Sequence, residues 1–232
     1  MIMKQDTEVL DPQEPQNSVS RRKFFSLAGI GLLSASVLAA SCKKDNPVLD
    51  GQSIDLGSGD VGILNYAYAL EQIEASFYTS VMSNPYAGMS VKESQLLNDI
   101  KLHEIAHREF FKNALGSAAI PKLTIRFDPV DFSSRDSVLG AAKAFEDLGV
   151  AAYNGAGKLI ESVDYLLLAG KIVSVEARHA ALIRDLISNG SFADNTIVDS
   201  NGLEMSKSPN EVLSIAGAFI KDKISANNLP TS

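Results

Sequence analysis

The stretch LHEIAHREFF, residues 102–111, carries the spacing that decides the fold of this chain. His103 and His107 flank Glu104 in the order H-E-x-x-H, the helical pattern in which two histidines bind one zinc ion and the glutamate acts as a base. Taken alone, this pattern predicts a zinc peptidase. The 232 residues contain only three histidines, so the position of the third one tests that interpretation.

The third histidine, His179, lies in VEARHAALIR and again follows a glutamate, Glu176, by three residues. A second zinc-peptidase pattern would need histidine where the sequence has Val175. The element that recurs is therefore Glu-x-x-His, which puts a carboxylate and an imidazole one turn apart on the same face of a helix. The recurrence favours a metal site built by two helices over a zinc-peptidase helix.

Two further segments, LEQIEASFY and AFEDLGVAAY, share a second spacing. Glu71 precedes Tyr78 by seven residues, and Glu146 precedes Tyr153 by the same number. These two glutamates are 75 residues apart, and the two Glu-x-x-His motifs are 72 residues apart. Two such similar offsets indicate a duplicated helical hairpin.

Capping signals and hydrophobic periodicity predict an all-α chain, and no convincing pair of strands is expected. The connection 117–133 has 17 residues. Fully extended, it can reach ~56 Å, further than the ~39 Å length of a helix of roughly 26 residues. The second and third helices can therefore run parallel, joined by a long crossover. Helices are expected at 60–83 with Asp60 as cap, 90–116 with a capping box at Ser90 and Glu93, 134–161, 164–189, and from Ser208 onward.

Distances from the turns put the glutamates of both hairpins at a common height of ~20 Å, at ~1.5 Å per residue. Their neighbours are apolar at core spacings, for example Leu70, Phe77 and Leu148. Four ionised carboxylates buried together need counter-charge, and two divalent cations supply it. One Glu from each of two helices and Glu-x-x-His from each of the other two form the ligand set of di-iron and di-manganese bundles.

Over residues 61–189 the sequence resembles the ferritin-like superfamily, and LEQIEASFY, AFEDLGVAAY and VEARHAALIR resemble its exported bacterial branch, which is related to plant desiccation-related proteins. The resemblance implies a ferritin-like four-helix bundle with a long crossover between helices 2 and 3, plus a C-terminal fifth helix. It also implies two divalent metal ions, iron or manganese. The expected metal ligands are Glu71, Glu104, His107, Glu146, Glu176 and His179, with Glu104 and Glu176 as bridges.

Tyr78 and Tyr153 are expected to point at the site, as hydrogen-bond donors or carriers of a transient electron; ordinary core tyrosines remain an alternative. Glu74, one turn from Glu71, could replace or assist it as a ligand. We prefer Glu71 because the repeat pairs it with a glutamate, whereas it pairs Glu74 with Gly149.

The N-terminal segment 1–41 resembles a twin-arginine export signal, with SRRKFF before a short apolar run. Cys42 follows it in the position of a lipidated cysteine, although simple cleavage near Ala40 is an alternative. These features predict a protein exported to the periplasm or cell envelope and anchored in the membrane by lipid. The remaining domains are expected to be a tether at 42–59, the bundle at 60–190, and a loop with the C-terminal helix at 191–232.

A net charge of −7 argues against nucleic acid as a partner. The principal functional hypothesis is redox chemistry on O2 or H2O2, as a ferroxidase, peroxidase or catalase-like enzyme. A non-enzymatic metal-binding or stress-protective envelope protein is the main alternative, and a zinc metallopeptidase through HEIAH is a third. A lipid tether disfavours a closed storage cage, so we expect a monomer or dimer.

Overall fold

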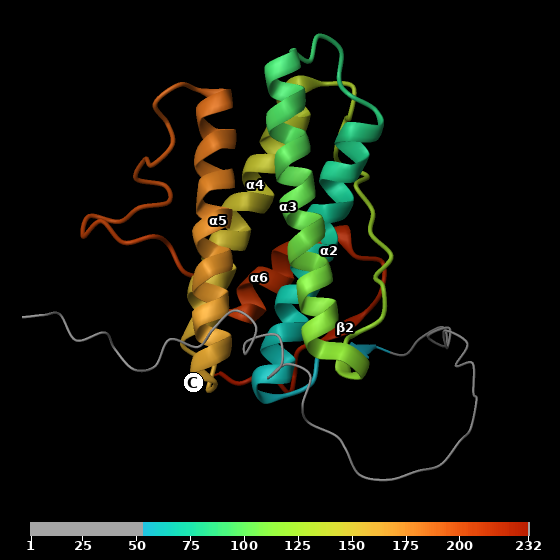
Figure 1. Ribbon diagram of the computed structural model, residues 1–232, viewed down its shortest axis with the longest axis vertical. Helices are drawn as coiled ribbons and strands as arrows, with labels where there is room; N and C mark the ends of the chain where they lie inside the picture. The colour runs from blue at the N-terminus through green and yellow to red at the C-terminus, as the bar shows by residue number, and fades with distance from the viewer. Residues whose placement is uncertain (1–52, 232) are drawn as a thin grey trace, which may run out of the picture. The chain divides into compact units, whose positions relative to one another are not determined.

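The computed structural model describes residues 53–231, and most of them are helical (Figure 1). The predicted all-α class is confirmed. A short helix and two single 3-10 turns accompany four long helices. The long helices are α2 (Gly59–Ser83), α3 (Val91–Leu115), α4 (Arg135–Gly157) and α5 (Val163–Ile187); the short elements are η1 (Gly116–Ala118), α6 (Pro209–Ala216) and η2 (Gly217–Phe219).

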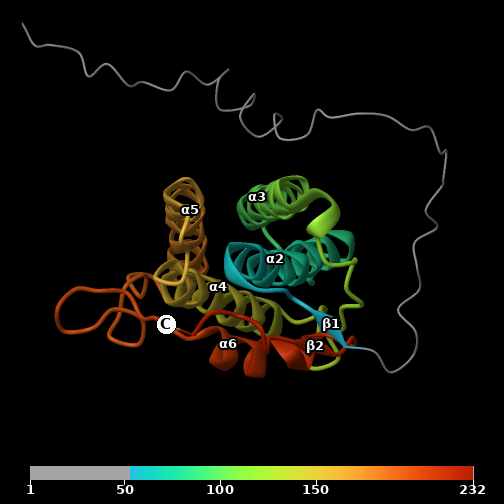
Figure 2. The ribbon, with the colours of Figure 1, turned by 90° about the horizontal axis from the view of Figure 1, so that it is seen from below.

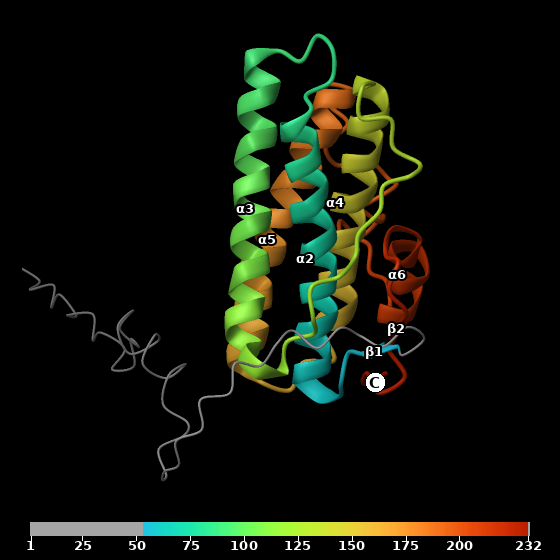
Figure 3. The same ribbon diagram turned by 90° about the vertical axis from the view of Figure 1, so that its right-hand side faces the viewer.

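The long helices form two antiparallel hairpins, α2 with α3 and α4 with α5, which meet mainly through α2 and α4. Between the hairpins the chain returns along the length of the bundle (Figure 3), so α3 and α4 run parallel. This is the predicted crossover. Viewed along the bundle, α3 and α5 lie on one side, α2 and α4 in the middle, and α6 on the opposite side (Figure 2).

Two buried amides of α2 fix the crossover. The side chain of Asn65 donates to the backbone carbonyls of Leu56 and Ala118 and accepts from the N–H of Ile120. Two helical turns further along α2, the side chain of Gln72 accepts from the N–H of Leu123. Both amides are buried. Their hydrogen bonds satisfy backbone groups of the crossover that would otherwise be buried against α2 without a partner. The crossover therefore packs in one register along α2.

The helix ends follow from local chemistry, with one correction. The capping box of Ser90 and Glu93 is present as predicted. Asp60, however, does not cap α2, because Ser58 occupies the N-cap position. The Asp60 carboxylate instead accepts from the N–H groups of Glu161 and Ser162 in the turn between α4 and α5. That tertiary contact satisfies N–H groups just before α5, and α4 ends at Gly157, before the predicted residue 161.

The C-terminal region adds a feature that sequence patterns did not indicate. Strands β1 (Ile54–Asp55) and β2 (Ile224–Ser225) pair in parallel, with Ile54 opposite Ile224. The expectation of no strand pair was therefore wrong, because two-residue strands are too short to show alternation. Among the helices of residues 53–231, none has the length and apolar character needed to span a membrane. The predictions for residues 1–41 and Cys42 lie outside the described residues.

Candidate metal centre

All six side chains predicted as metal ligands come together in the middle of the bundle. α2 and α4 each contribute a single glutamate, and α3 and α5 each contribute a glutamate and a histidine from one face. All four carboxylates have an exposed fraction of 0%, and both imidazoles lie among them. The set is Glu71, Glu104, His107, Glu146, Glu176 and His179.

Each imidazole contacts both hairpins. Nδ1 of His107 lies 2.7 Å from Oε1 of Glu176, on the other hairpin, and 3.5 Å from Oε2 of Glu71, on its own. Nδ1 of His179 lies 2.8 Å from Oε1 of Glu104 on the other hairpin. It is 3.5 Å from the glutamate of α4. The two halves are thus related by an approximate twofold, as the duplicated sequence pattern predicted.

The ligand atoms fall into two overlapping groups that could each hold a metal ion. One group combines Glu71 and His107 with two shared glutamates, and the other combines Glu146 and His179 with the same two. Within each group all donor atoms lie within 4.8 Å of one another. The shared residues, common to both groups, are Glu104 and Glu176.

Many donor atoms of the cluster have no hydrogen-bond partner, and a bound cation would satisfy them. Although several N···O separations are short, eight buried atoms of the six residues lack a hydrogen-bond partner within residues 53–231. Both oxygens of Glu104 and of Glu176 are among these atoms, together with Nδ1 of both histidines. Carboxylate oxygens and imidazole nitrogens that converge on one buried region are the arrangement that a bound cation requires, and these donors suit iron and manganese.

The two tyrosines tie the hairpins together in a reciprocal way. The hydroxyl of Tyr78 on α2 donates to Oε1 of Glu146 on α4 at 2.5 Å. The hydroxyl of Tyr153 on α4 donates to Oε1 of Glu71 on α2, also at 2.5 Å. Burial, followed by the adjacent carboxylates, raises the pKa of both tyrosines well above the ordinary value. Both hydroxyls therefore keep their protons and orient one carboxylate each.

Without a metal ion, the ionisable groups of the cluster have strongly shifted pKa values. Burial acts to lower the pKa of His107 and His179, but the surrounding carboxylates outweigh it and raise both values to about 12. Burial raises the pKa of Glu146 to about 8 and that of Glu71 well above its usual range. Glu104 behaves differently: burial acts to raise its pKa, but the two imidazoles outweigh burial and lower it to about 2. Without a cation, the cluster balances charge with protons.

His103 contacts the other motif rather than its own. Its Nδ1 lies 2.9 Å from Nε2 of His179, and the two rings stack 5.2 Å apart. His103 belongs to neither donor group, whereas His107 belongs to one of them, and this argues against the zinc-peptidase arrangement. Nδ1 of His179 faces the carboxylates, and the contact of its Nε2 with His103 orients the ring.

Glu74 lies outside both donor groups, whereas Glu71 belongs to one of them. Its carboxylate is buried and points at α4, where a Cβ added to Gly149 would lie 2.8 Å from Oε1. Burial and the charges of the shared glutamates raise the pKa of Glu74 well above its usual range. Gly149, which occupies the position equivalent to Glu74 in the repeat, therefore leaves room for the Glu74 side chain. The sequence alone shows only that the two halves of the repeat differ at this position.

A sequence model of the ferritin-like domain matches residues 59–189. The chain belongs to the ferritin-like family. The match covers the four long helices that supply the six side chains, so the bundle, its crossover and the carboxylate–histidine cluster are the features of a ferritin-like protein. No curated protein matches the chain closely enough to name an activity.

Proposed function

We propose that this ferritin-like protein binds two divalent iron or manganese ions and uses them for redox chemistry on O2 or H2O2. The observation that carries the proposal is the pair of overlapping donor groups that share Glu104 and Glu176. Each group offers three carboxylates and one imidazole, a hard, oxygen-rich set that suits these two metals. The shared carboxylates would bridge the ions, as predicted from the sequence.

Charge supports a pair of ions over a single ion. Four fully buried carboxylates carry −4 when ionised, and two divalent ions carry +4. Burial of so much uncompensated charge would destabilise the bundle strongly. Two ions therefore replace the protons that the metal-free cluster needs.

Bound at this position, two redox-active ions would supply paired one-electron changes to an oxidant. The side chains of the protein have separate roles. Tyr78 and Tyr153 hold a proton beside the carboxylates that they orient, at Glu146 and Glu71. His103 orients His179 through their 2.9 Å contact. The apolar residues packed around the cluster exclude water from it.

The first test is the metal content of the full-length protein after anaerobic loading with Fe(II) or Mn(II), followed by removal of free metal. About two ions per chain are expected. The loaded protein is then mixed with O2 or with H2O2, and oxidation of iron or consumption of peroxide is followed. A chain that binds less than one ion would contradict the proposed site.

A non-enzymatic metal-binding or stress-protective role is the second candidate, favoured by the complete burial of all four carboxylates. The same experiment separates the two. Full metal binding without turnover of either oxidant, with either metal, would favour the second candidate. Replacement of Tyr153 by Phe gives a further distinction, because an enzyme would lose rate while keeping its metal content.

We also propose that the protein is exported and lipid-anchored through Cys42, as a monomer or dimer. The support is the SRRKFF sequence followed by an apolar run and a single cysteine. Expression with a labelled fatty acid, followed by fractionation, tests this. Label in the envelope fraction that disappears in Cys42→Ser is expected, whereas a soluble, unlabelled wild-type chain would contradict it.

A further inference from the structure

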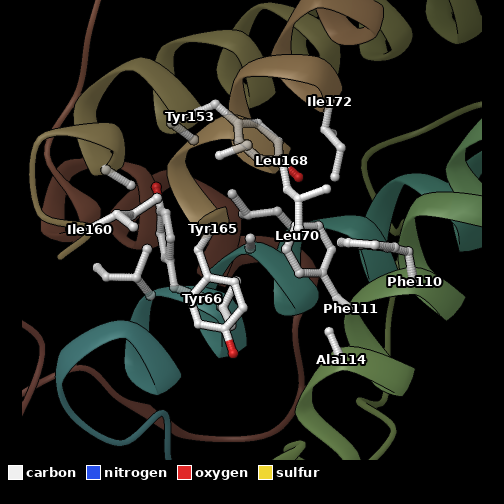
Figure 4. Close-up of a pocket in the computed structure, with 16 residues that line it drawn as sticks. Tyr66, Leu70, Phe110, Phe111, Ala114, Tyr153, Ile160, Tyr165, Leu168 and Ile172 are labelled. Carbon is white, nitrogen blue, oxygen red and sulfur yellow. The ribbon is translucent and has the colours of Figure 1, made fainter. Parts of the chain in front are cut away.

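A small apolar cavity lies between α3 and α5, beside the candidate metal centre (Figure 4). All four long helices line it. It exists because the two hairpins meet through α2 and α4, whereas α3 and α5 contact each other little. The space open to the centre of a water-sized molecule is about 30 Å³. By this measure one water needs ~10–15 Å³, so the cavity has room for a molecule of roughly two or three heavy atoms.

The walls of the cavity are apolar. They consist of the side chains of alanine, leucine and isoleucine and the rings of phenylalanine and tyrosine. Almost all of the lining surface belongs to carbon atoms. A buried water needs about two to four polar partners, and apolar cavities without them stay dry and take up apolar guests such as xenon. The cavity is therefore a site for a small apolar molecule.

Of the two oxidants considered above, O2 suits such a site better than H2O2 does. H2O2 donates and accepts hydrogen bonds in water, and it would lose them in the cavity without replacement. O2 is an apolar molecule of two atoms, and it gives up almost no hydrogen bonding when it leaves water. An apolar space of this volume therefore favours O2 over H2O2.

The inner end of the cavity adjoins the metal centre. Phe111 follows His107 by four residues on α3, and both Phe111 and Ile172 line the cavity. Ile172 precedes Glu176 by four residues on α5. Each of these two lining residues therefore lies about one turn, or ~6 Å along its helix, from a side chain of the cluster. Tyr153 also lines the cavity, and its hydroxyl donates to the clustered glutamate of α2 at 2.5 Å.

We infer that the cavity binds O2, and that O2 reaches the metal centre through it whereas H2O2 does not. Binding of O2 requires the protein alone, but the route rests on the metal chemistry proposed above. Reduction of one O2 to H2O2 takes two electrons, one from each of two Fe(II) ions, and two protons from water. The cavity supplies the O2 for this step, and its apolar walls keep water out of the path.

O2 is paramagnetic and speeds the relaxation of nearby methyl groups, so dissolved O2 reports its own position. Methyl relaxation of the metal-free, full-length protein is measured by NMR under O2 and under N2 at the same pressure. Ile63 lines the cavity, whereas Ile100 is not part of its lining, and both side chains are 2% exposed. We expect a clear enhancement by O2 at Ile63 and at Ile172, and little at Ile100. Equal effects at Ile63 and Ile100 would overturn the inference.

A variant that fills the cavity provides the second test. Ala169 lines the cavity and is half-buried, so Ala169→Leu places more carbon atoms in the space and should abolish the enhancement at Ile63. Ala144 is exposed on α4 and is not part of the lining, and Ala144→Leu is the matched control, expected to keep the enhancement. An unchanged enhancement in folded Ala169→Leu would overturn the inference. If this variant fails to fold, the comparison of Ile63 with Ile100 in the wild type decides alone.

The route is tested on full-length protein loaded anaerobically with Fe(II). Ala169→Leu should slow oxidation of the iron by O2 severalfold, leave its oxidation by H2O2 unchanged and keep the metal content of the wild type. Equal slowing with both oxidants, or with neither, would overturn the route through the cavity. A wild-type chain that binds no iron would contradict the proposed function instead, and the relaxation measurement on metal-free protein would still decide whether the cavity binds O2.

Discussion

Glu104 and Glu71 are both fully buried carboxylates in the cluster, yet the geometry predicts different consequences when each becomes glutamine. Glu104 belongs to both donor groups, whereas Glu71 belongs to one. Glu71→Gln therefore leaves the group of Glu146 and His179 intact. Glu104→Gln leaves neither group intact. Glutamine keeps the size of the side chain, so the change removes charge and one donor oxygen.

The magnitude follows from linkage. A metal present at about 100 times its dissociation constant stabilises the folded state by ~2.7 kcal/mol for each site. In a protein of this size, 1 kcal/mol raises the unfolding temperature by about 2–4 °C. Two sites thus predict a rise of roughly 10–20 °C on metal addition in the wild type, about half of that in Glu71→Gln, and almost none in Glu104→Gln.

Thermal unfolding of each variant is measured with and without metal, so that any change in the metal-free protein cancels. Metal content after dialysis gives the stoichiometry in parallel: about two, one and zero ions per chain. Glu109→Gln is the control, because Glu109 lies on the same helix with a side chain 43% exposed. Equal losses in Glu71→Gln and Glu104→Gln would refute two overlapping sites, since a single ion held by all six residues would behave that way.

Three further outcomes follow from the structure. Gly149→Ala should lower the free energy of unfolding by about 1–3 kcal/mol through its clash with Glu74, whereas Gly140→Ala on the same helix has open space and should raise it by up to ~1 kcal/mol; equal effects would show that the carboxylate moves freely. The two imidazoles of the cluster, with pKa values of about 12 against an ordinary 6.5, contribute stability that is complete below about pH 6.5 and is lost as pH rises toward 12. Metal-free protein should therefore unfold at lower temperature as pH rises from about 6 to 9, and loaded protein should not, because its ligands are already deprotonated; a flat profile for the metal-free protein would contradict this. Tyr66→Phe removes a buried hydroxyl that has no hydrogen-bond partner within residues 53–231. It should leave the free energy of unfolding unchanged or raise it by up to about 1 kcal/mol in urea titrations, whereas a clear loss would mean that the hydroxyl has a partner.

The fold and the six clustered residues were predictable because they follow from rules that act along a helix. Glu104 and His107 share a face because they are three residues apart, and the same rule applies to Glu176 and His179. Their common height follows from the rise per residue and the positions of the turns. These relations depend only on spacing along the chain and not on contacts between different helices.

What sequence reasoning missed depends on contacts between segments that are distant in the chain. Asp60 has the properties of a cap, but the free N–H groups of Glu161 and Ser162 compete for it, and they are a hundred residues away. The contact of the exposed His103 with His179 likewise joins helices of different hairpins. The separation of α3 and α5 could not be foreseen either, because it depends on how the two hairpins pack through α2 and α4.

The separation of α3 and α5 also predicts where the metal acts on the fold. Each donor group combines residues of both hairpins, so an ion joins α3 to α5 through Glu104 and Glu176 where those helices otherwise contact each other little. α2 and α4 pack on each other and are joined by the reciprocal tyrosines, which need no metal. Removal of metal should therefore speed amide exchange in α3 and α5 around the shared glutamates and change α2 and α4 much less. Hydrogen exchange followed by mass spectrometry on the loaded and chelated protein measures this. An equal loss of protection in all four helices would mean that the metal stabilises the whole bundle and does not specifically close the two hairpins.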